Sequence, residues 1–189
     1  MRKSLELAEK AIELDPDDPG GYKMLGMLAL SRRDYDRALA YREKAFSLAP
    51  NDFLVLYGLG LVLYKAGNFE QGIEILKKAI RLNPSKMVTI MWSLAEAQLV
   101  ARRYEESIET SNRAAARQPE AVYPHIILAA AYGAIGRQEE AKAEASRVMH
   151  INPKFTVSGW MNSRLQKDPA DTERYASLLL KAGLPENTK

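Results

Sequence analysis

The chain has 189 residues, of which 47% are apolar and 27% charged, a composition typical of a folded globular protein. Its 27 basic and 24 acidic residues are interspersed, so the sequence has no basic arm for nucleic acid. The absence of cysteine excludes disulfides, thiolate metal sites and a cysteine nucleophile. Because the N-terminus has no signal-peptide core and no long apolar run follows, we expect a cytoplasmic protein that does not insert into a membrane.

A repeat runs through the chain from its first predicted helix. Prolines recur at spacings of 34, 34, 35 and 34 residues, and Ala or Val stands five positions before each one. A helix has to end near each proline because the ring lacks an N–H and disfavours helical geometry in the residue before it. The prolines that separate the units are Pro16, Pro50, Pro84, Pro119 and Pro153.

Small residues recur at two fixed places in each unit, as with Gly60 and Gly72 in the second. They predict a helical hairpin whose two helices cross closely, since a small side chain at the crossing lets the backbones approach. Short polar segments between the halves are typical of turns, in which Asp34 and Asn68 are candidate N-caps of the second helices.

The segments YKMLGMLAL…YDRA…KAFSLAP and LYGLGLVLYKAGNFEQG…KKAIRLNP resemble the tetratricopeptide repeat (TPR) family. The resemblance implies an all-α, right-handed superhelical solenoid of antiparallel helix hairpins. Residues 1–18 match only the second helix of a truncated repeat, so we expect one face of this helix to be bare. The full repeats are expected at 19–52, 53–86, 87–121 and 122–155.

Residues 156–189 are expected to hold a degenerate helix and then a capping helix that covers the last repeat. Asp168 is the candidate N-cap, Pro169 the first helical residue, Leu178 to Leu180 the buried stripe and Gly183 the stop. The runs KDPADTERY and LLLKAGLPE resemble the C-terminal TPR region of bacterial class III adenylate or guanylate cyclase-type, TolB-like signalling proteins. This resemblance implies an appended regulatory module.

No constellation of residues in the chain predicts catalysis. His125 and His150 have no metal-ligand spacing, and His125 falls in a slot of the repeat where a packed, hydrogen-bonded imidazole is expected. The Glu105-Glu106 pair opens a second helix, where carboxylates favour the helix dipole and face water. We therefore expect a non-enzymatic chain with no cofactor and no metal.

Function is expected on the inner wall that the first helices line in a solenoid. The register places a mainly apolar and aromatic set of side chains there. Only Lys23 and Lys65 are of the kind that clamps chaperone C-termini, and Met27 and Leu61 take the asparagine positions, so such a clamp is disfavoured. The expected groove residues are Lys23, Met24, Met27, Tyr57, Leu61, Tyr64, Lys65, Trp92, Glu96, Tyr123, Ile126 and Ile127.

Two functions from different classes are compatible with this groove. The first is a protein-interaction scaffold that binds an apolar helix or extended segment, with a homodimer through the N-terminal helix or the groove as one form of it. The second is a regulatory or dimerisation module C-terminal to a bacterial nucleotide cyclase domain. As an alternative to both, the same apolar side chains pack against the chain's own C-terminal segment or a second copy.

Overall fold

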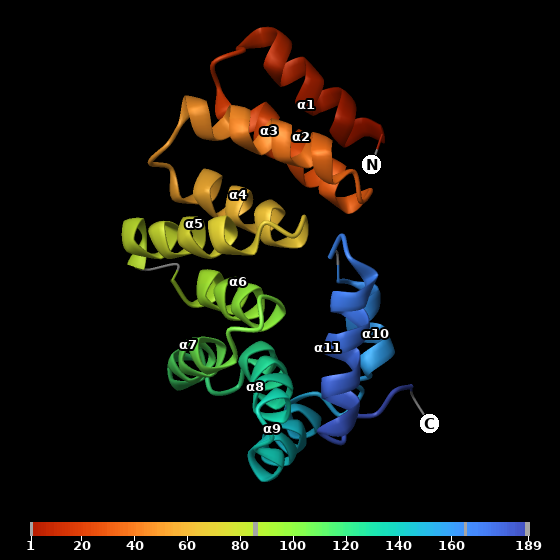
Figure 1. Ribbon diagram of the computed structural model, residues 1–189. Coiled ribbons are helices and arrows are strands. Elements are labelled where there is room, and N and C mark those ends of the chain that lie inside the picture. The colour runs from red at the N-terminus through yellow and green to blue at the C-terminus, as the bar shows by residue number, and fades with distance from the viewer. Residues whose placement is uncertain (1, 85–86, 165, 188–189) are drawn as a thin grey trace. The chain divides into compact units, whose positions relative to one another are not determined.

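The computed structural model describes residues 2–84, 87–164 and 166–187, which contain eleven α-helices and no strand (Figure 1). The predicted all-α fold is thus confirmed. The chain divides into two compact units, residues 1–87 and 88–189, each described here by itself. The first unit holds α1 (Arg2–Leu14), α2 (Pro19–Ser31), α3 (Tyr35–Leu48), α4 (Phe53–Lys65) and α5 (Phe69–Leu82). The second holds α6 (Met87–Val100), α7 (Tyr104–Arg117), α8 (Val122–Ala134), α9 (Gln138–Ile151), α10 (Val157–Asn162) and α11 (Pro169–Lys181).

The repeat prolines set the ends of the second helices. The helix α3 ends at Leu48, two residues before Pro50, and α5 ends at the same distance before its proline. At the start of α3, the Asp34 carboxylate accepts a hydrogen bond of 3.3 Å from the Arg37 amide, as predicted. Asn68 likewise occupies the N-cap position of α5, as predicted, but its side chain makes no capping hydrogen bond. A neutral amide gains less than a carboxylate from the positive end of the helix dipole.

The two helices of a hairpin touch at the predicted small residues. A methyl group on Gly60 of α4 would lie 2.7 Å from the Leu76 side chain, and one on Gly72 of α5 would lie 2.9 Å from the Tyr64 amide nitrogen. Between α6 and α7, Ser107 stands where α5 has Gly72, and its Oγ donates a 2.8 Å hydrogen bond to the Ala95 carbonyl. The crossing thus keeps its geometry with either a glycine or a small side chain that satisfies the neighbouring backbone.

Each hairpin turns through one residue with positive φ. The residues are Arg33 (60°), Gly67 (97°), Arg102 (62°) and Gly136 (81°), at repeat spacing. An L-residue pays of order 1 kcal/mol in this left-handed region, whereas glycine does not. The two arginine turns therefore adopt the glycine conformation without a glycine.

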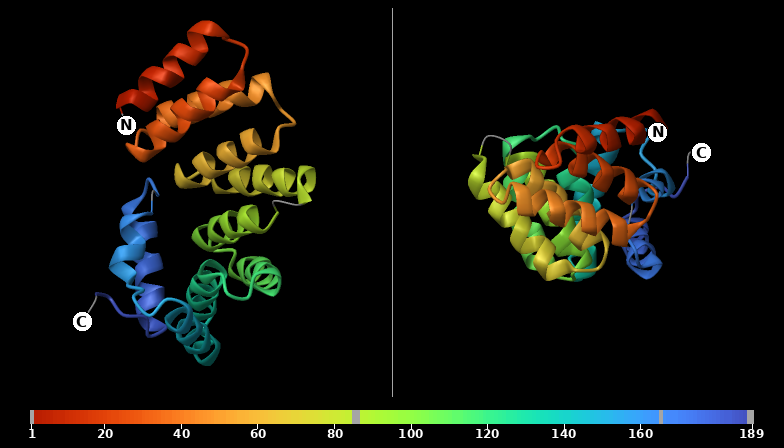
Figure 2. Two further views of the ribbon diagram at one scale, coloured as in Figure 1. Left: turned by 180° about the vertical axis from the view of Figure 1, so that it is seen from behind. Right: turned by 90° about the horizontal axis from the view of Figure 1, so that it is seen from above.

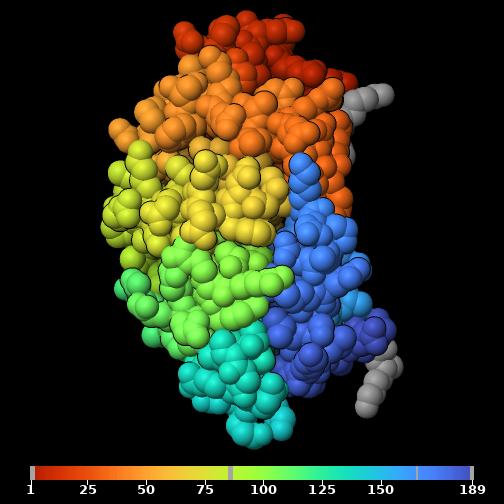
Figure 3. Space-filling view, viewed as in Figure 1, coloured from red at the N-terminus to blue at the C-terminus, as the bar shows by residue number. Residues whose placement is uncertain are grey.

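In the second unit, the C-terminal segment, residues 155–164 and 166–187, packs on the first helices. The helix α11 runs beside α8 (Figures 1 and 2), and residues of the segment lie directly against α6 and α8 in the space-filling view (Figure 3). After α11 the chain returns to α10, where the amides of Val157 and Ser158 donate to the carbonyls of Pro185 and Glu186 at 2.8 and 3.0 Å. These two hydrogen bonds join the end of the C-terminal segment to the start of α10.

The capping helix begins as predicted, because the Asp168 carboxylate accepts a 2.9 Å bond from Ala170 and Pro169 is the first helical residue. The predicted stripe of Leu178 to Leu180 holds for Leu179 and in part for Leu178, which packs partly buried against the core, and is wrong for Leu180. Only Leu179 is fully buried, while Leu180 is 39% exposed, since consecutive residues on a helix point about 100° apart. The buried stripe is instead Tyr175, Leu179 and Ala182, followed by Leu184.

Candidate functional site

The expected groove residues fall into two groups, one in each unit. In the first unit, a concave region of about 370 Å³ lies between α2 and α4, and we call it the α2–α4 groove. It contains five of the seven residues predicted there, and Tyr64 and Lys65 are not among its lining residues. The groove is lined by Gly20, Lys23, Met24, Met27, Leu30, Arg42, Leu54, Tyr57, Gly58 and Leu61.

The rim of the α2–α4 groove exposes apolar side chains. Met24 is 40% exposed, and Met27 and Leu54 are 50% exposed. At its edge the Lys23 ammonium lies 4.0 Å from the Asp52 carboxylate, which also caps α4 through the Leu54 amide at 2.7 Å. Methionine is unbranched and adapts its shape to a partner, so this rim suits an apolar ligand.

Tyr64 and Lys65 are corrections to the predicted groove. Both side chains are buried in the structure, at 1% and 8% exposure, and the Lys65 ammonium lies 4.8 Å from the centre of the Tyr64 ring. Tyr64 belongs to the last turn of α4, where the close approach of Gly72 in α5 brings the two helix backbones together. The crossing turns this tyrosine into a core residue.

Arg42 of α3 was not predicted as a groove residue, yet it lines the groove with a side chain that is only 9% exposed. A methyl group on Gly58 would lie 2.5 Å from its Cζ atom, and one on Gly26 would lie 2.9 Å from its Nε atom. The guanidinium therefore occupies space that two glycines leave open. One available signal was Tyr41, an aromatic residue one position ahead of its usual slot in the repeat, which puts an arginine in that slot.

In the second unit, the predicted residues of α6 and α8 face the C-terminal segment. The rings of Trp92 and Tyr123 stack with centroids 5.2 Å apart, and Tyr123 meets Trp160 edge-on at 4.8 Å. Two of these three rings come from the inner wall, and the third comes from α10. These rings therefore pack against one another within the unit, with the ring from α10 against the inner wall, and all three stay partly exposed.

A buried ion pair joins the C-terminal segment to α6. The Arg164 guanidinium lies 3.1 Å from the Glu96 carboxylate and 3.9 Å from the centre of the Trp160 ring. Burial alone lowers the pKa of Arg164, but the Glu96 carboxylate, with smaller contributions from Tyr175 and Tyr123, holds the pKa above its ordinary value. Near the end of α6, Arg174 of α11 donates to the Val100 carbonyl at 2.8 Å and to the Tyr104 hydroxyl at 3.2 Å.

Ile126 and Ile127 are further corrections, because both are core residues with exposures of 0% and 1%. They share one hydrophobic cluster with Tyr175 and Leu179 of α11. Of the alternatives that the sequence left open, packing against the chain's own C-terminal segment is the one observed on this face of the second unit.

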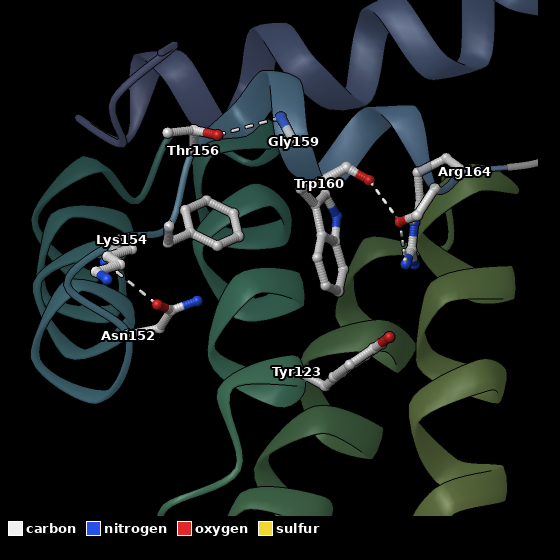
Figure 4. A pocket seen from close by; sticks show the side chains of 9 residues that line it. Tyr123, Asn152, Lys154, Thr156, Gly159, Trp160 and Arg164 are labelled. Carbon is white, nitrogen blue, oxygen red and sulfur yellow. Dashed lines mark hydrogen bonds between the residues drawn. The ribbon is translucent and has the colours of Figure 1, made fainter. Parts of the chain in front are cut away.

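A smaller pocket of about 320 Å³ lies between α10 and the start of α8 (Figure 4). The rings of Tyr123 and Trp160 point into it, with Arg164 on one side and Asn152 and Lys154 on the other. Its cationic side chains and its rings come mainly from loop residues after α9 and from α10. Among these residues, Arg164 is engaged by Glu96 and by the Ser163 hydroxyl at 3.0 Å.

His125 has the structural role expected of it. Its Nδ1 lies 2.6 Å from a Glu144 carboxylate oxygen and its Nε2 lies 3.2 Å from the Pro119 carbonyl oxygen. Both partners are acceptors, so only the imidazolium can donate to both. The hydrogen bond to Glu144 raises the pKa of His125 above its ordinary value, against the opposing effect of burial. The pair ties the first and second helices of this hairpin together.

The described residues hold neither a metal-binding cluster nor a membrane-spanning helix. No group of three or more histidine, cysteine or carboxylate side chains in this part of the chain is arranged to hold a metal ion. None of the helices described is both long and apolar enough to cross a membrane.

Stacked antiparallel helix hairpins with a concave, partly apolar first-helix face define a helical-repeat protein. The tetratricopeptide repeat family matches residues 2–53, 23–86 and 57–122, and the chain belongs to this family. A search of curated proteins found no match.

Solved structures share the fold. PilW, described as a widely conserved type IV pilus biogenesis factor, is 13% identical over 96% of this chain and 82% of its own, with a TM-score of 0.78. A thermophilic TPR protein of Thermus thermophilus is 24% identical over 93% of this chain and 89% of its own, with a TM-score of 0.66. YrrB, described as a TPR protein with an unusual peptide-binding site, is 20% identical over 94% and 91%, with a TM-score of 0.65.

Proposed function

We propose that this chain is a non-catalytic protein-interaction module that binds an apolar helix or extended segment of a partner protein in the α2–α4 groove. TPR proteins generally mediate protein–protein interactions, and the family of the chain supports the general class. The observation that carries the proposal is the apolar rim of the groove, with Met24, Met27 and Leu54 all exposed by 40% or more. Exposed apolar side chains gathered in a concave surface are typical of a binding site.

The inner wall of the second unit is less suited to bind a partner than the α2–α4 groove, because it is already covered. There the apolar and aromatic side chains of α6 and α8 pack against the chain's own C-terminal segment. A partner on that face would have to displace the buried Glu96–Arg164 pair and the α11 core residues. The α2–α4 groove needs no such displacement among the first-unit residues that line it.

Tyr57 is the residue most suited to anchor a partner. It lines the groove on α4 and is partly exposed. An aromatic ring buries a large area on binding and loses little conformational freedom, so such residues commonly dominate an interface.

YrrB, which has the same fold, is described as having a peptide-binding site, and this description supports a peptide as the type of ligand. A role beside a nucleotide cyclase remains a prediction of the sequence alone.

Site-specific photo-crosslinking tests the proposal. A photoreactive amino acid at Met27, which lies in the groove, should crosslink to a discrete partner that mass spectrometry identifies. The same amino acid at Leu180, which is 39% exposed on α11, is the matched control and should give no such adduct. Binding of the identified partner should then weaken by about 1–3 kcal/mol in Tyr57→Ala with a much smaller loss of stability. Equal adducts from both positions would contradict the proposal.

A further inference from the structure

The floor of the α2–α4 groove carries a buried guanidinium without a counter-charge. Arg42 is 9% exposed, and its Nε atom is fully buried with no hydrogen-bond partner. Among the described residues, no carboxylate lies within ion-pair distance of it. Burial lowers the pKa of Arg42 from its ordinary value, the direction expected where no anion compensates the desolvation.

This position is apolar or small in every other repeat. Counting by the repeat spacing, Arg42 corresponds to Leu76, Ser111 and Ala145, all of them buried. A long charged side chain at a core position costs free energy unless it is paired and hydrogen-bonded. The fold accommodates it because Gly58 leaves the space for its guanidinium. The arginine is thus held at a cost to the folded chain, and its fork of N–H donors lines the groove.

We propose that the α2–α4 groove selects partner segments that insert an acidic side chain between apolar ones, with the carboxylate paired to Arg42. The proposal rests on the function proposed above and specifies the chemistry of the partner. A guanidinium binds a carboxylate through two parallel N–H···O bonds, which fixes the position of the ligand as well as adding attraction. Desolvation by the apolar rim strengthens the pair, because no water screens it.

The occupant to which we commit is a protein segment with an internal glutamate. The apolar side chains of Met24, Met27 and Leu54 surround the entrance, so the carboxylate has to reach the floor on an apolar stem. The two methylene groups of glutamate provide such a stem, and neighbouring apolar residues of the segment cover the rim. Lys23 at the edge is already within 4.0 Å of Asp52, which leaves Arg42 as the floor cation of this groove.

Peptide selection on the full-length chain tests this proposal. The probe is a display library of short random segments inserted internally, so that no segment has a free C-terminus. A second library presents the same segments at a free C-terminus. Both are selected on the wild-type chain and on Arg42→Leu, which carries the residue found at the corresponding position 76. The best peptide is then synthesised with blocked ends, together with its Glu→Gln variant.

On the wild-type chain we expect the internal library to enrich one glutamate flanked by apolar residues. The Glu→Gln peptide should bind roughly tenfold more weakly or worse, and Arg42→Leu should bind both peptides about equally, because the charge-assisted pair has gone. Arg42→Lys should recover only part of the preference, since an ammonium lacks the planar fork. Thermal melting of Arg42→Leu should be no lower than that of the wild type, which separates lost recognition from lost folding.

Each other outcome overturns one of the two proposals. Apolar peptides with no acidic position, bound equally by both proteins, overturn the role of Arg42 and leave the proposed function standing. Enrichment from the free C-terminal library alone overturns the side-chain carboxylate in favour of a chain terminus. A dimer of the wild type that Arg42→Leu converts to monomer makes a second copy the occupant. No enrichment from either library overturns the proposed function itself.

Discussion

The carboxylate of Glu96 in α6 and the guanidinium of Arg164, 68 residues later, form a 3.1 Å ion pair in which both side chains are less than a tenth exposed. The pair fixes the C-terminal segment to the first helix of its unit. An isolated buried charge is far less favourable than either a paired one or an apolar residue of similar size. The two members should therefore be strongly coupled.

Replacement of one member should destabilise the second unit sharply. We expect Arg164→Met to cost about 3–5 kcal/mol, because it takes the guanidinium away from the buried Glu96 carboxylate. The double variant Glu96→Leu with Arg164→Met should recover most of the loss. Trp92 and Trp160 are the only two tryptophans of the chain, and both lie in this unit, so denaturant unfolding followed by tryptophan fluorescence reports on it. Arg137→Met, which breaks an exposed pair with Glu140, is the control and should leave the midpoint unchanged.

The capping helix offers a matched pair of adjacent leucines. Leu179 is 0% exposed in the core of the second unit, whereas Leu180 is 39% exposed. We expect Leu179→Ala to lower the free energy of unfolding by about 2–5 kcal/mol, through lost burial and the cavity it leaves. Leu180→Ala should change it by about 0.5 kcal/mol or less. Similar losses in the two variants would mean that α11 does not cover the α6 and α8 face in solution.

The His125–Glu144 pair should make the second unit more stable in mild acid. The folded pKa of His125 is raised, so its contribution is complete below the ordinary histidine pKa of about 6.5 and is lost as pH rises through the raised value. Thermal melting between mildly acidic and mildly alkaline pH should therefore show stability falling with pH. Glu144→Gln should flatten this dependence. His150→Gln leaves the pair intact and should preserve the slope of stability against pH. Loss of the slope in that variant would mean that His150, and not the His125–Glu144 pair, causes it.

Much of the fold follows from local features of the sequence. The helix ends near Pro50 and Pro84, and the close crossing at Gly60 and Gly72, are properties of short segments that recur at fixed spacing. A proline stops a helix, and a glycine admits a neighbouring backbone, whatever the rest of the chain does. Periodicity therefore predicted the hairpins before any long-range contact was known.

The site could be predicted only in part, because two of its features depend on distant contacts. Arg164 lies after the last repeat, whereas Glu96 lies within the third repeat, so no spacing in the sequence relates the two residues that form this contact. Arg42 looks like a surface residue of an amphipathic helix until Gly58, on the next first helix, is seen to make room for it. The repeat positions that face inward were predictable, but what covers them or lies beneath them was not.

The exposed face of α1 is a candidate surface for self-association. Leu7 and Leu14, seven residues apart and so on one face of the helix, are 62% and 75% exposed, while Ala8 on a different face is buried. We propose that copies of the chain associate through this face, and Leu7→Glu should then shift sedimentation toward the monomer without lowering the melting temperature. Lys142→Glu, at an exposed lysine of α9 far along the chain from α1, is the charge-reversal control. A wild type that sediments as a monomer at every concentration would remove this interface.

The effect of Gly58→Ala on the stability of the first unit should change sign when Arg42 is replaced by alanine. In the wild type, Gly58→Ala places a methyl group against the Arg42 guanidinium, so we expect it to destabilise the first unit by about 1–3 kcal/mol through overpacking. In an Arg42→Ala background that space is empty, and the same change should stabilise by up to about 1 kcal/mol because alanine favours a helix more than glycine does. In the second unit, Ser111 stands at the position of Arg42 and Ile127 at the position of Gly58. There the small residue is on the second helix and the large one on the following first helix, the reverse of the first unit. Circular dichroism of the four chains under denaturant measures the cycle. If Gly58→Ala has the same sign in both backgrounds, the glycine is not there to admit the guanidinium, and Arg42 does not hold the position at the groove floor that the proposed carboxylate recognition needs.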